Sequence, residues 1–392
     1  MTVSLTTAES ALKTVYLDTV VDAINTKTNP FLTIVNRTSC DIWGKNIMKV
    51  IKKGVNGGMK AGTETDDLPI SSGVDYETLT LPLKNFYGTI EISDKALRAS
   101  ANHAGAFVDL LNAEMESLIN SCKNNFGRML FGDGSGKLAT VVQTGLNGTC
   151  TVDSVKLLQE GMIIDFISPG GYVIPCVKNR KIVSIDREHN TIQIDGEPGW
   201  LNGVVDGSYI TIQGSLNNEL TGLEAIFSKE GSIYGLDKKV HKFLNPYIKE
   251  NQGEITEEAL QKAIDTIEEN TGNSINYIVC SFGVKRALQA LFLKNYISLD
   301  VAELAGGYKA MSYNGIPIVA DRFCPEGTLY LLNTDDFELH QLCDWSWLDS
   351  EDGRILHQIP GKPVYSATLV KYANLLCSKP CGQGKISGIT EK

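Results

Sequence analysis

The sequence predicts an α+β protein with a mixed sheet, one long helix and an inserted small β-barrel. Three observations support this fold class. An apolar stripe with helical spacing runs without proline from Asp94 to Leu130. Short runs of β-forming residues, separated by glycine and asparagine turns, fill residues 138–219. After them, residues 256–292 follow the pattern helix, strand, helix.

The first 92 residues predict an arm followed by a hairpin. Residues 1–45 hold one amphipathic helix, which Pro30 separates from the rest of the arm; the positions on its face are Leu12, Val15, Tyr16, Thr19, Val20, Ala23 and Ile24. Residues 46–92 contain Gly54, Gly57, Gly58 and Gly62, then the acidic stretch TETDDLP and the alternating run ETLTLPL, which predicts a long two-stranded hairpin. Two strands with so little apolar surface are not stable alone, so we expect the hairpin to lie on an adjacent subunit.

The long helix follows the strand-like segment PLKNFYGTIEIS. Its stripe consists of Leu97, Ala101, Ala104, Val108, Leu111, Met115, Leu118, Cys122, Phe126 and Met129. Such a helix is about 55 Å long at 1.5 Å per residue. It would cross the full diameter of a compact chain of this size, with a radius of gyration of about 21 Å. We therefore expect an elongated subunit that neighbours stabilise.

Residues 138–219 predict an independent small barrel or sandwich. The β-type runs are MIIDFIS, YVIPCV, KIVSID, TIQID and SYITIQG. The block carries five basic and nine acidic residues, which excludes a nucleic-acid module.

The C-terminal half predicts a mixed sheet with two helices. The expected helices are TEEALQKAIDTIEEN and FGVKRALQALF, the second with Ser281 as its N-cap. The expected strands are INYIVCS, GIPIVADRF, TLYLLN and a final pair around RILHQI and VYSATLVKYANLLCS.

Composition excludes several classes of protein. A formal net charge of −10 and a pI near 5.1 argue against tight sequence-independent binding of DNA or RNA. The sequence has no run of 18 apolar residues, and its start lacks the pattern of a signal peptide, so we expect folding in the cytosol and no membrane partner. Nine scattered cysteines predict buried, reduced thiols.

The motif FGDGSGK at the end of the long helix invites a phosphate-loop interpretation. The Walker pattern requires a glycine where Phe131 stands and a Ser or Thr where Leu138 stands. A phosphate loop also begins a helix, whereas this loop ends one. We therefore interpret Gly132, Asp133, Gly134 and Gly136 as a structural helix end and turn.

No catalytic, cofactor or metal site is expected. The five histidines are isolated, and Cys377 and Cys381 lack the CxxC spacing of zinc or redox sites. Ser281 has no GxSxG elbow around it. The chain is therefore not expected to be an enzyme.

Several residues are candidates for intersubunit contacts. They are Lys52, Lys53, Lys60, Asp66, Asp67, Trp345 and Trp347. A solvated surface for the charged residues, and a place in the core for the two tryptophans, are the alternatives.

Taken in order, four segments resemble the major capsid proteins of tailed bacteriophages, the Hong Kong 97 type of shell fold. The segments are YGTIEISDKAL, GDGSG, INYIVCSFGVKRAL and YNGIPIVADRFCPEGTLYLLNTDDFEL. The resemblance covers nearly the whole chain except the insert. In this family the glycine loop continues directly into a segment like LTGLEAIF, which here follows only at residue 220. The barrel therefore interrupts one ancestral loop, and its two ends should lie close together.

The resemblance implies a role for each part. The parts are an N-terminal arm (1–45), an extended loop hairpin (46–92), the spine helix and peripheral domain (93–137), the inserted β-barrel domain (138–219), more peripheral domain (220–255), an axial domain (256–345) and return strands of both domains (346–392).

The implied function is that of a major capsid protein, which self-assembles into the icosahedral shell around the double-stranded DNA genome of a tailed phage. Its partners would be copies of itself in hexamers and pentamers, a scaffolding protein, a portal, and packaged DNA bound without sequence specificity. It would assemble in the host bacterial cytoplasm and reside in the virion. Two alternatives are an encapsulin-type nanocompartment shell and a cytosolic nucleotide-using enzyme built around GDGSGK.

Overall fold

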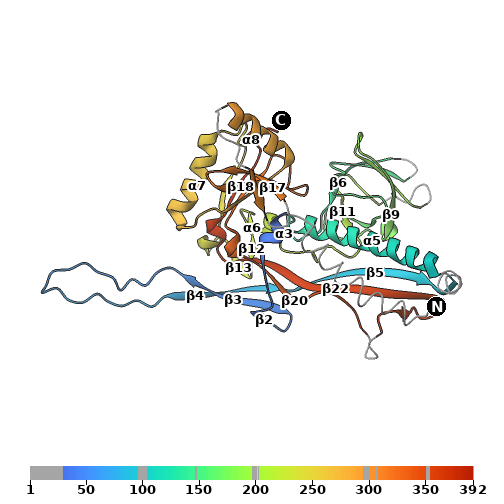
Figure 1. Cartoon of the computed structure of the whole chain (residues 1–392), viewed down its shortest axis with the longest axis horizontal. Helices are drawn as coiled ribbons and strands as arrows, with labels where there is room; N and C mark the ends of the chain where they lie inside the picture. Colours follow the sequence, from blue (N-terminus) through green and yellow to red (C-terminus); the bar gives the residue numbers. More distant parts are fainter. Residues whose placement is uncertain are drawn as a thin grey trace. The chain divides into compact units, whose positions relative to one another are not determined.

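A computed structural model describes residues 30–95, 104–145, 148–196, 201, 203–294, 301–304, 308–349 and 354–391. The chain divides into two compact units. The first comprises Met1–Ile119 and Ile226–Lys392, and the second comprises Asn120–Ala225 (Figure 1). The predicted helix in residues 12–24 and the start of the predicted long helix, residues 96–103, lie outside the described residues.

The hairpin of the first unit is a three-stranded antiparallel sheet. It consists of β2 (Ile42–Trp43), β3 (Asn46–Lys53) and β4 (Asp75–Pro82). The loop of residues 54–74 extends beyond these strands (Figure 1). The predicted hairpin was too long at its C-terminal end, because β5 (Lys84–Ser93) leaves it and pairs with a different strand.

Strand β5 belongs to a five-stranded sheet. Its order is β1 (Asn36–Thr38), β20 (Phe337–Trp347), β22 (Val364–Cys377) and β21 (His357–Gln358), and β5 pairs with β22 over ten residues (Figure 1). Along β5, Phe86, Ile90 and Ile92 are buried and alternate with exposed residues, as expected for a strand with one face on a core. The short helix α3 (Pro30–Ile34) packs Phe31 edge-on against Phe337, with ring centroids 5.5 Å apart.

The C-terminal strands were predicted only in part. VYSATLVKYANLLCS forms β22, as expected, but RILHQI contributes only the two residues of β21. The eleven residues of β20 were not predicted. Their burial follows no strict alternation, because the register between β20 and β22 shifts after Gln341 and again after Cys343.

A seven-stranded mixed sheet forms the other part of the first unit. Its order is β14 (Tyr247–Lys249), β23 (Gly384–Ile386), β19 (Leu329–Leu332), β15 (Tyr277–Cys280), β18 (Ile316–Ala320), β17 (Tyr308–Tyr313) and β16 (Val301–Leu304). The central strand β15 runs parallel to β18 and antiparallel to β19, so the predicted mixed sheet is confirmed.

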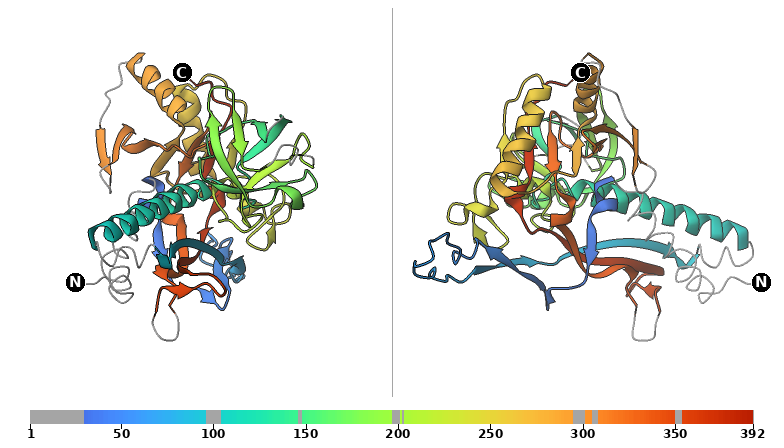
Figure 2. Two further views of the ribbon diagram at one scale, coloured as in Figure 1. Left: turned by 90° about the vertical axis from the view of Figure 1, so that its right-hand side faces the viewer. Right: turned by 60° about the vertical axis from the view of Figure 1, so that its left-hand side comes forward.

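Two helices accompany this sheet, α7 (Glu257–Thr271) and α8 (Phe282–Lys294) (Figure 2). The Thr256 hydroxyl accepts a hydrogen bond from the Ala259 amide, and Gly272 ends α7 in the left-handed conformation. The Ser281 hydroxyl accepts from the Val284 amide at 3.3 Å, so its predicted capping role is confirmed. Buried side chains of both helices and of β15 and β19 form one hydrophobic core.

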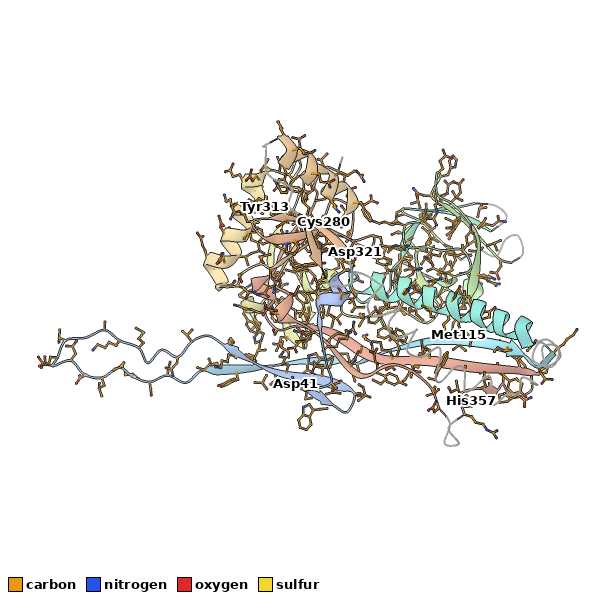
Figure 3. All side chains as sticks on the ribbon, viewed as in Figure 1. Asp41, Met115, Cys280, Tyr313, Asp321 and His357 are labelled. Carbon is orange, nitrogen blue, oxygen red and sulfur yellow. The ribbon has the colours of Figure 1, made fainter. Side chains whose placement is uncertain are left out.

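Helix α5 (Ala104–Met129) is the described part of the predicted long helix. Of the predicted stripe, Met115, Cys122, Phe126 and Met129 are buried and Leu118 is half-buried, which confirms the helical spacing where side chains are described. Figure 3 shows Met115 on this helix. Residues up to Ile119 belong to the first unit and those from Asn120 to the second.

The second unit contains a closed six-stranded barrel. Its strands are β6 (Ala139–Thr144), β7 (Thr149–Val152), β8 (Ile163–Ile167), β9 (Arg180–Asp186), β10 (Thr191–Ile194) and β11 (Tyr209–Ile212), in the order β10-β7-β6-β11-β8-β9. Four predicted runs form β8, β9, β10 and β11. The run YVIPCV is not a strand: Pro175 cannot donate to a ladder, and Pro175–Val177 form a 3-10 turn, η2. Strands β6 and β7 were not predicted.

Short elements complete the fold. They are α6 (Leu223–Ile226), β12 (Ser232–Ile233), β13 (Leu236–Asp237) and the 3-10 turns η3 (Lys242–Leu244), η4 (Thr334–Asp336) and η5 (Pro380–Gly382).

Candidate assembly interface

The loop of residues 54–74 exposes apolar side chains. Val55, Met59, Leu68 and Ile70 are each between 86% and 94% exposed. The Gly57 amide donates to the Ser72 hydroxyl at 3.0 Å and links the two arms of the loop. Four large apolar side chains without a core are typical of a surface that another molecule covers.

Three of the predicted charged contact residues, Lys60, Asp66 and Asp67, lie close together in this loop. The Lys60 ammonium donates to the Asp67 carbonyl at 3.2 Å and lies 3.8 Å from the Asp66 carboxylate. Asp66 in turn accepts from the amide and hydroxyl of Thr63, and these hydrogen bonds lower the pKa of its carboxyl group. The three residues therefore order their own loop, while their side chains stay exposed.

Lys52 and Lys53 lie on opposite faces of β3. Lys53 forms an ion pair with Glu77 of β4 at 3.2 Å. Lys52 is exposed on the other face, opposite Tyr76. The structure therefore separates two lysines that the sequence analysis treated together, because neighbouring strand residues point to opposite sides.

Trp345 and Trp347 lie on β20 and not on the hairpin. They are 4% and 6% exposed, which places them in the core of the subunit. The Lys371 ammonium lies 5.8 Å from the ring centroid of Trp345 and 2.5 Å from the Asp344 carboxylate. Burial lowers the pKa of Lys371, and Asp344 partly opposes this shift. The two indoles therefore offer little surface to another molecule.

The glycine loop after α5 forms a tight turn. Gly134 and Gly136 have φ angles of +88° and +84°, which favour glycine. The Asp133 carboxylate accepts from the Ser135 amide at 2.9 Å, and the Ser135 carbonyl accepts from the Asn217 amide at 2.9 Å. The loop thus ends a helix and joins the two ends of the barrel segment, as predicted. An acidic side chain already accepts from one of the amides that a phosphate would need.

A buried ion pair holds this junction together, and the sequence analysis missed it. The Arg128 guanidinium, in the last turn of α5, binds both carboxylate oxygens of Glu219 at 2.7 and 2.6 Å. Their side chains are 6% and 3% exposed. Close by, the Leu223 amide donates to the Leu130 carbonyl at 2.8 Å. The predicted closeness of the two ends of the insert is therefore confirmed.

A second charged cluster joins β3, β20 and the turn that follows β1. The Glu338 carboxylate lies 2.6 Å from the Lys49 ammonium and 3.0 Å from Nε2 of the buried His340. Nδ1 of His340 lies 3.0 Å from the carbonyl of Cys40. This cluster ties the base of the hairpin to the five-stranded sheet.

The other motifs remain isolated. The described residues include no group of three His, Cys, Asp or Glu side chains placed to hold a metal ion. All nine cysteines are free; five are buried, but Cys40 and Cys176 are exposed, so the prediction of buried thiols was wrong for these two. Within the part of the chain that the structure describes, no helix is both long and apolar enough to cross a membrane.

Comparison with solved structures defines the class of fold. The capsid asymmetric unit of cyanophage A-1(L) has a TM-score of 0.55 at 12% identity, over 96% of this chain and 93% of that chain. The capsid of an empty GTA particle has a TM-score of 0.51 at 10% identity, over 93% and 90%. An encapsulin from Synechococcus elongatus PCC 7942 has a TM-score of 0.47 at 10% identity, over 92% and 88%. The chain has a mixed α and β fold of the phage-capsid class.

The sequence match narrows this class. Residues 179–354 match the family model described as SU10 major capsid protein, and no curated protein matches the chain. The match covers less than half of the chain, and together with the capsid fold it supports the predicted function, that of a major capsid protein that forms the shell of a virion.

Proposed function

We propose that the chain is the subunit of a Hong Kong 97 type icosahedral shell that encloses double-stranded DNA. The observation that carries this proposal is the loop of residues 54–74, whose four exposed apolar side chains have no core of their own. A subunit on its own would leave these side chains in water, whereas a neighbour that covers them gains their burial.

The proposed parts follow the chain. Residues 1–45 act as an arm and 46–92 as an extended loop; residues 93–137 and 220–255 form the peripheral domain, 256–345 the axial domain, and 346–392 return strands. The seven-stranded sheet with α7 and α8 supports the axial assignment, and the pairing of β5 with β22 supports the peripheral one. Residues 138–219 are an insertion in one loop, which the Arg128–Glu219 pair closes at its base.

The role is structural and includes no catalysis. Copies of the chain in hexamers and pentamers would be its main partners, with a scaffolding protein and a portal during assembly. Lys52, Lys53, Lys60, Asp66 and Asp67 are the proposed charged contacts. The net charge of −10 is compatible with a shell around DNA, because an acidic surface repels the packaged DNA and so does not bind it tightly.

Electron microscopy of the purified chain tests the proposal. We expect capsomers or closed shells in negative stain, and a sedimentation profile that shifts to large species as the protein concentration rises. A monomer at every concentration would count against self-assembly. Particles from an infected host should also contain DNA that resists nuclease, whereas a protein cargo without DNA would favour an encapsulin-type compartment.

A further inference from the structure

One asparagine of the loop of residues 54–74 directly precedes a glycine. Asn56 and Gly57 are both exposed, and neither belongs to a helix or a strand. Glycine has no Cβ, so the backbone nitrogen of Gly57 is open to the side chain of the residue before it. Such a pair can react within the chain when the geometry brings the amide carbon of the asparagine to this nitrogen.

Hydrogen bonds hold both groups of this pair. The Gly58 amide donates to Oδ1 of Asn56 at 2.8 Å. This Asx turn folds the side-chain carbonyl back over the peptide that follows it, which is the peptide of the Gly57 nitrogen. The Gly58 amide also polarises the carbonyl, as an oxyanion hole does for the negative charge that develops on an attacked carbonyl oxygen.

The nitrogen of Gly57 is held from another direction. Its N–H group donates to the Ser72 hydroxyl at 3.0 Å. The N–H bond lies in the plane of the peptide, so this contact leaves the face of the nitrogen free for attack. The nucleophile and the carbonyl are therefore each oriented by one hydrogen bond.

We propose that Asn56 is a site of spontaneous deamidation, with the Gly57 nitrogen as the nucleophile. Hydroxide from the solvent takes the Gly57 amide proton, and the nitrogen forms a bond to Cγ of Asn56, which closes a succinimide ring. The bond from Cγ to Nδ2 breaks, and Nδ2 leaves as ammonia with a proton from water, which restores the hydroxide. Water then opens the ring at either of its carbonyls and leaves an aspartate or an isoaspartate at position 56.

A second exposed asparagine–glycine pair has the opposite geometry. Asn314 and Gly315 form the turn between β17 and β18, with φ angles of +50° and +82°. These angles are typical of a type I′ hairpin turn, which the pairing of Tyr313 with Ile316 closes. Nδ2 of Asn314 donates to Oε1 of Gln261 on α7 at 3.1 Å. Ring closure here would break this hydrogen bond and distort the turn, so we expect Asn314 to be protected.

The reaction changes both the charge and the backbone of the loop. Residues 54–74 contain one lysine and three acidic residues, so their formal charge of −2 becomes −3. An isoaspartate also adds a methylene group to the main chain, and the Asx turn is lost. The charge of this loop therefore depends on the age of the chain. This inference goes beyond the proposed function and does not depend on it.

Peptide mapping by mass spectrometry measures the rate at each asparagine separately. The purified full chain is incubated in mildly alkaline buffer, once folded and once unfolded in urea, and the unfolded chain gives the reactivity that local sequence alone confers. We expect Asn56 to react in the folded chain at least as fast as in the unfolded chain, and Asn314 to react about tenfold more slowly when folded. Asn147 and Asn202, which also precede glycine, lie outside the described residues and are scored separately. Equal protection of Asn56 and Asn314 by folding overturns the proposal.

Two glycine substitutions test the role of the Gly57 nitrogen. A Cβ added at Gly57 would lie 2.9 Å from the Ser72 hydroxyl oxygen, which a rotation of that side chain can relieve. Gly73→Ala is the matched control, because its added Cβ has no atom within 4 Å and neither glycine needs a left-handed conformation. We expect Gly57→Ala to slow deamidation of Asn56 about tenfold, and Gly73→Ala to leave the rate unchanged. An unchanged rate in Gly57→Ala overturns the assigned nucleophile.

The product supplies a further measurement. A succinimide ring opens to both aspartate and isoaspartate, whereas direct hydrolysis of the side-chain amide by water yields aspartate alone. Fragmentation of the peptide that contains position 56 distinguishes the two products, because isoaspartate carries the main chain through its side-chain carbonyl. We expect both products in aged wild-type chains. Aspartate alone would mean that the ring does not form and that the Gly57 nitrogen takes no part.

Discussion

Arg128 and Glu219 form a bidentate ion pair that is nearly closed to water, although 91 positions separate them in the sequence. The guanidinium belongs to the last turn of α5, and the carboxylate lies beyond the last strand of the barrel. A buried pair of this geometry contributes little net stability against an apolar alternative, but loss of one partner leaves a charge without compensation. Its role is to fix the base of the barrel.

Glu219→Gln should therefore destabilise the second unit by about 3–5 kcal/mol. The reason is that the Arg128 guanidinium stays buried without its carboxylate. Hydrogen exchange of peptides from residues 120–225 measures this loss, and peptides of the seven-stranded sheet should change little. Lys229→Met, which breaks an exposed pair with Glu250, is the control and should cost at most about 1 kcal/mol. Similar losses in both variants would contradict the assigned role.

Gly136→Ala should destabilise the same junction. An added Cβ would lie 2.7 Å from the Ser215 carbonyl oxygen, and the φ angle of +84° is itself unfavourable for alanine. Gly161→Ala separates the two effects, because Gly161 has a φ of +88° but no atom within 4 Å of its added Cβ. We expect Gly161→Ala to cost about 1 kcal/mol and Gly136→Ala at least twice as much, measured by urea unfolding. Equal costs would mean that the loop relaxes away from Ser215.

Removal of the barrel should leave a folded subunit that still assembles. Residues 138–214 can be replaced by two glycines, because the Ser135 carbonyl already accepts from the Asn217 amide at 2.9 Å and Glu219 is retained for Arg128. We expect this variant to form capsomers or shells in negative stain. Deletion of 138–219 removes Glu219 as well and should be less stable in thermal unfolding. Complete misfolding of both variants would contradict the view of the barrel as an addition.

Lys238 should give the first unit a pH-dependent stability. Its ammonium donates to the carbonyls of Ile226 and Ser228 at 2.7 and 2.6 Å, and burial lowers its pKa from 10.5 to about 8. Between these two values the unfolded chain binds the proton more strongly than the folded chain, so stability rises with pH. We expect the unfolding free energy of wild type, relative to Lys238→Met, to rise by about 1–3 kcal/mol from pH 8 to pH 10. A difference that stays constant with pH would contradict the lowered pKa.

The glycine loop should not bind nucleotides. Titration of ATP with magnesium, followed by calorimetry, should give no saturable heat for wild type and the same result for Lys137→Ala. The reason is that the Asp133 carboxylate already accepts from the Ser135 amide, and phosphate would meet this negative charge. A saturable signal that Lys137→Ala abolishes would restore the enzyme alternative.

The elements predicted from the sequence are those with a clear apolar period. The spacing of Met115, Cys122, Phe126 and Met129 matches one face of α5, and the capped helices α7 and α8 begin and end within two residues of their prediction. Local hydrogen bonds and one buried face decide such elements, so short-range pattern is sufficient. The barrel was also predicted as a unit from short-range pattern, because its strands are short and are divided by turn residues.

The failures arise where distant residues decide the local structure. Strand β20 has two register shifts against β22, which removes its alternation, and β5 leaves the hairpin because β22 pairs with it. The pairing of Arg128 with Glu219 depends on the path of the whole barrel, and so no spacing rule predicts it. The exposed apolar residues of β3 left a weak signal in the sequence: Met48 and Val50 are apolar on both sides of Lys49, whereas a strand with one buried face alternates strictly.

The hydrogen bond between the Asn217 amide and the Ser135 carbonyl has a practical consequence. The two ends of the barrel segment are adjacent, so the backbone of the insert joins the rest of the chain at two neighbouring points. A foreign domain whose own termini lie close together satisfies the same geometric condition. The loop is therefore a suitable insertion point for another domain, and a shell built from such a chain would carry one copy of that domain for every subunit.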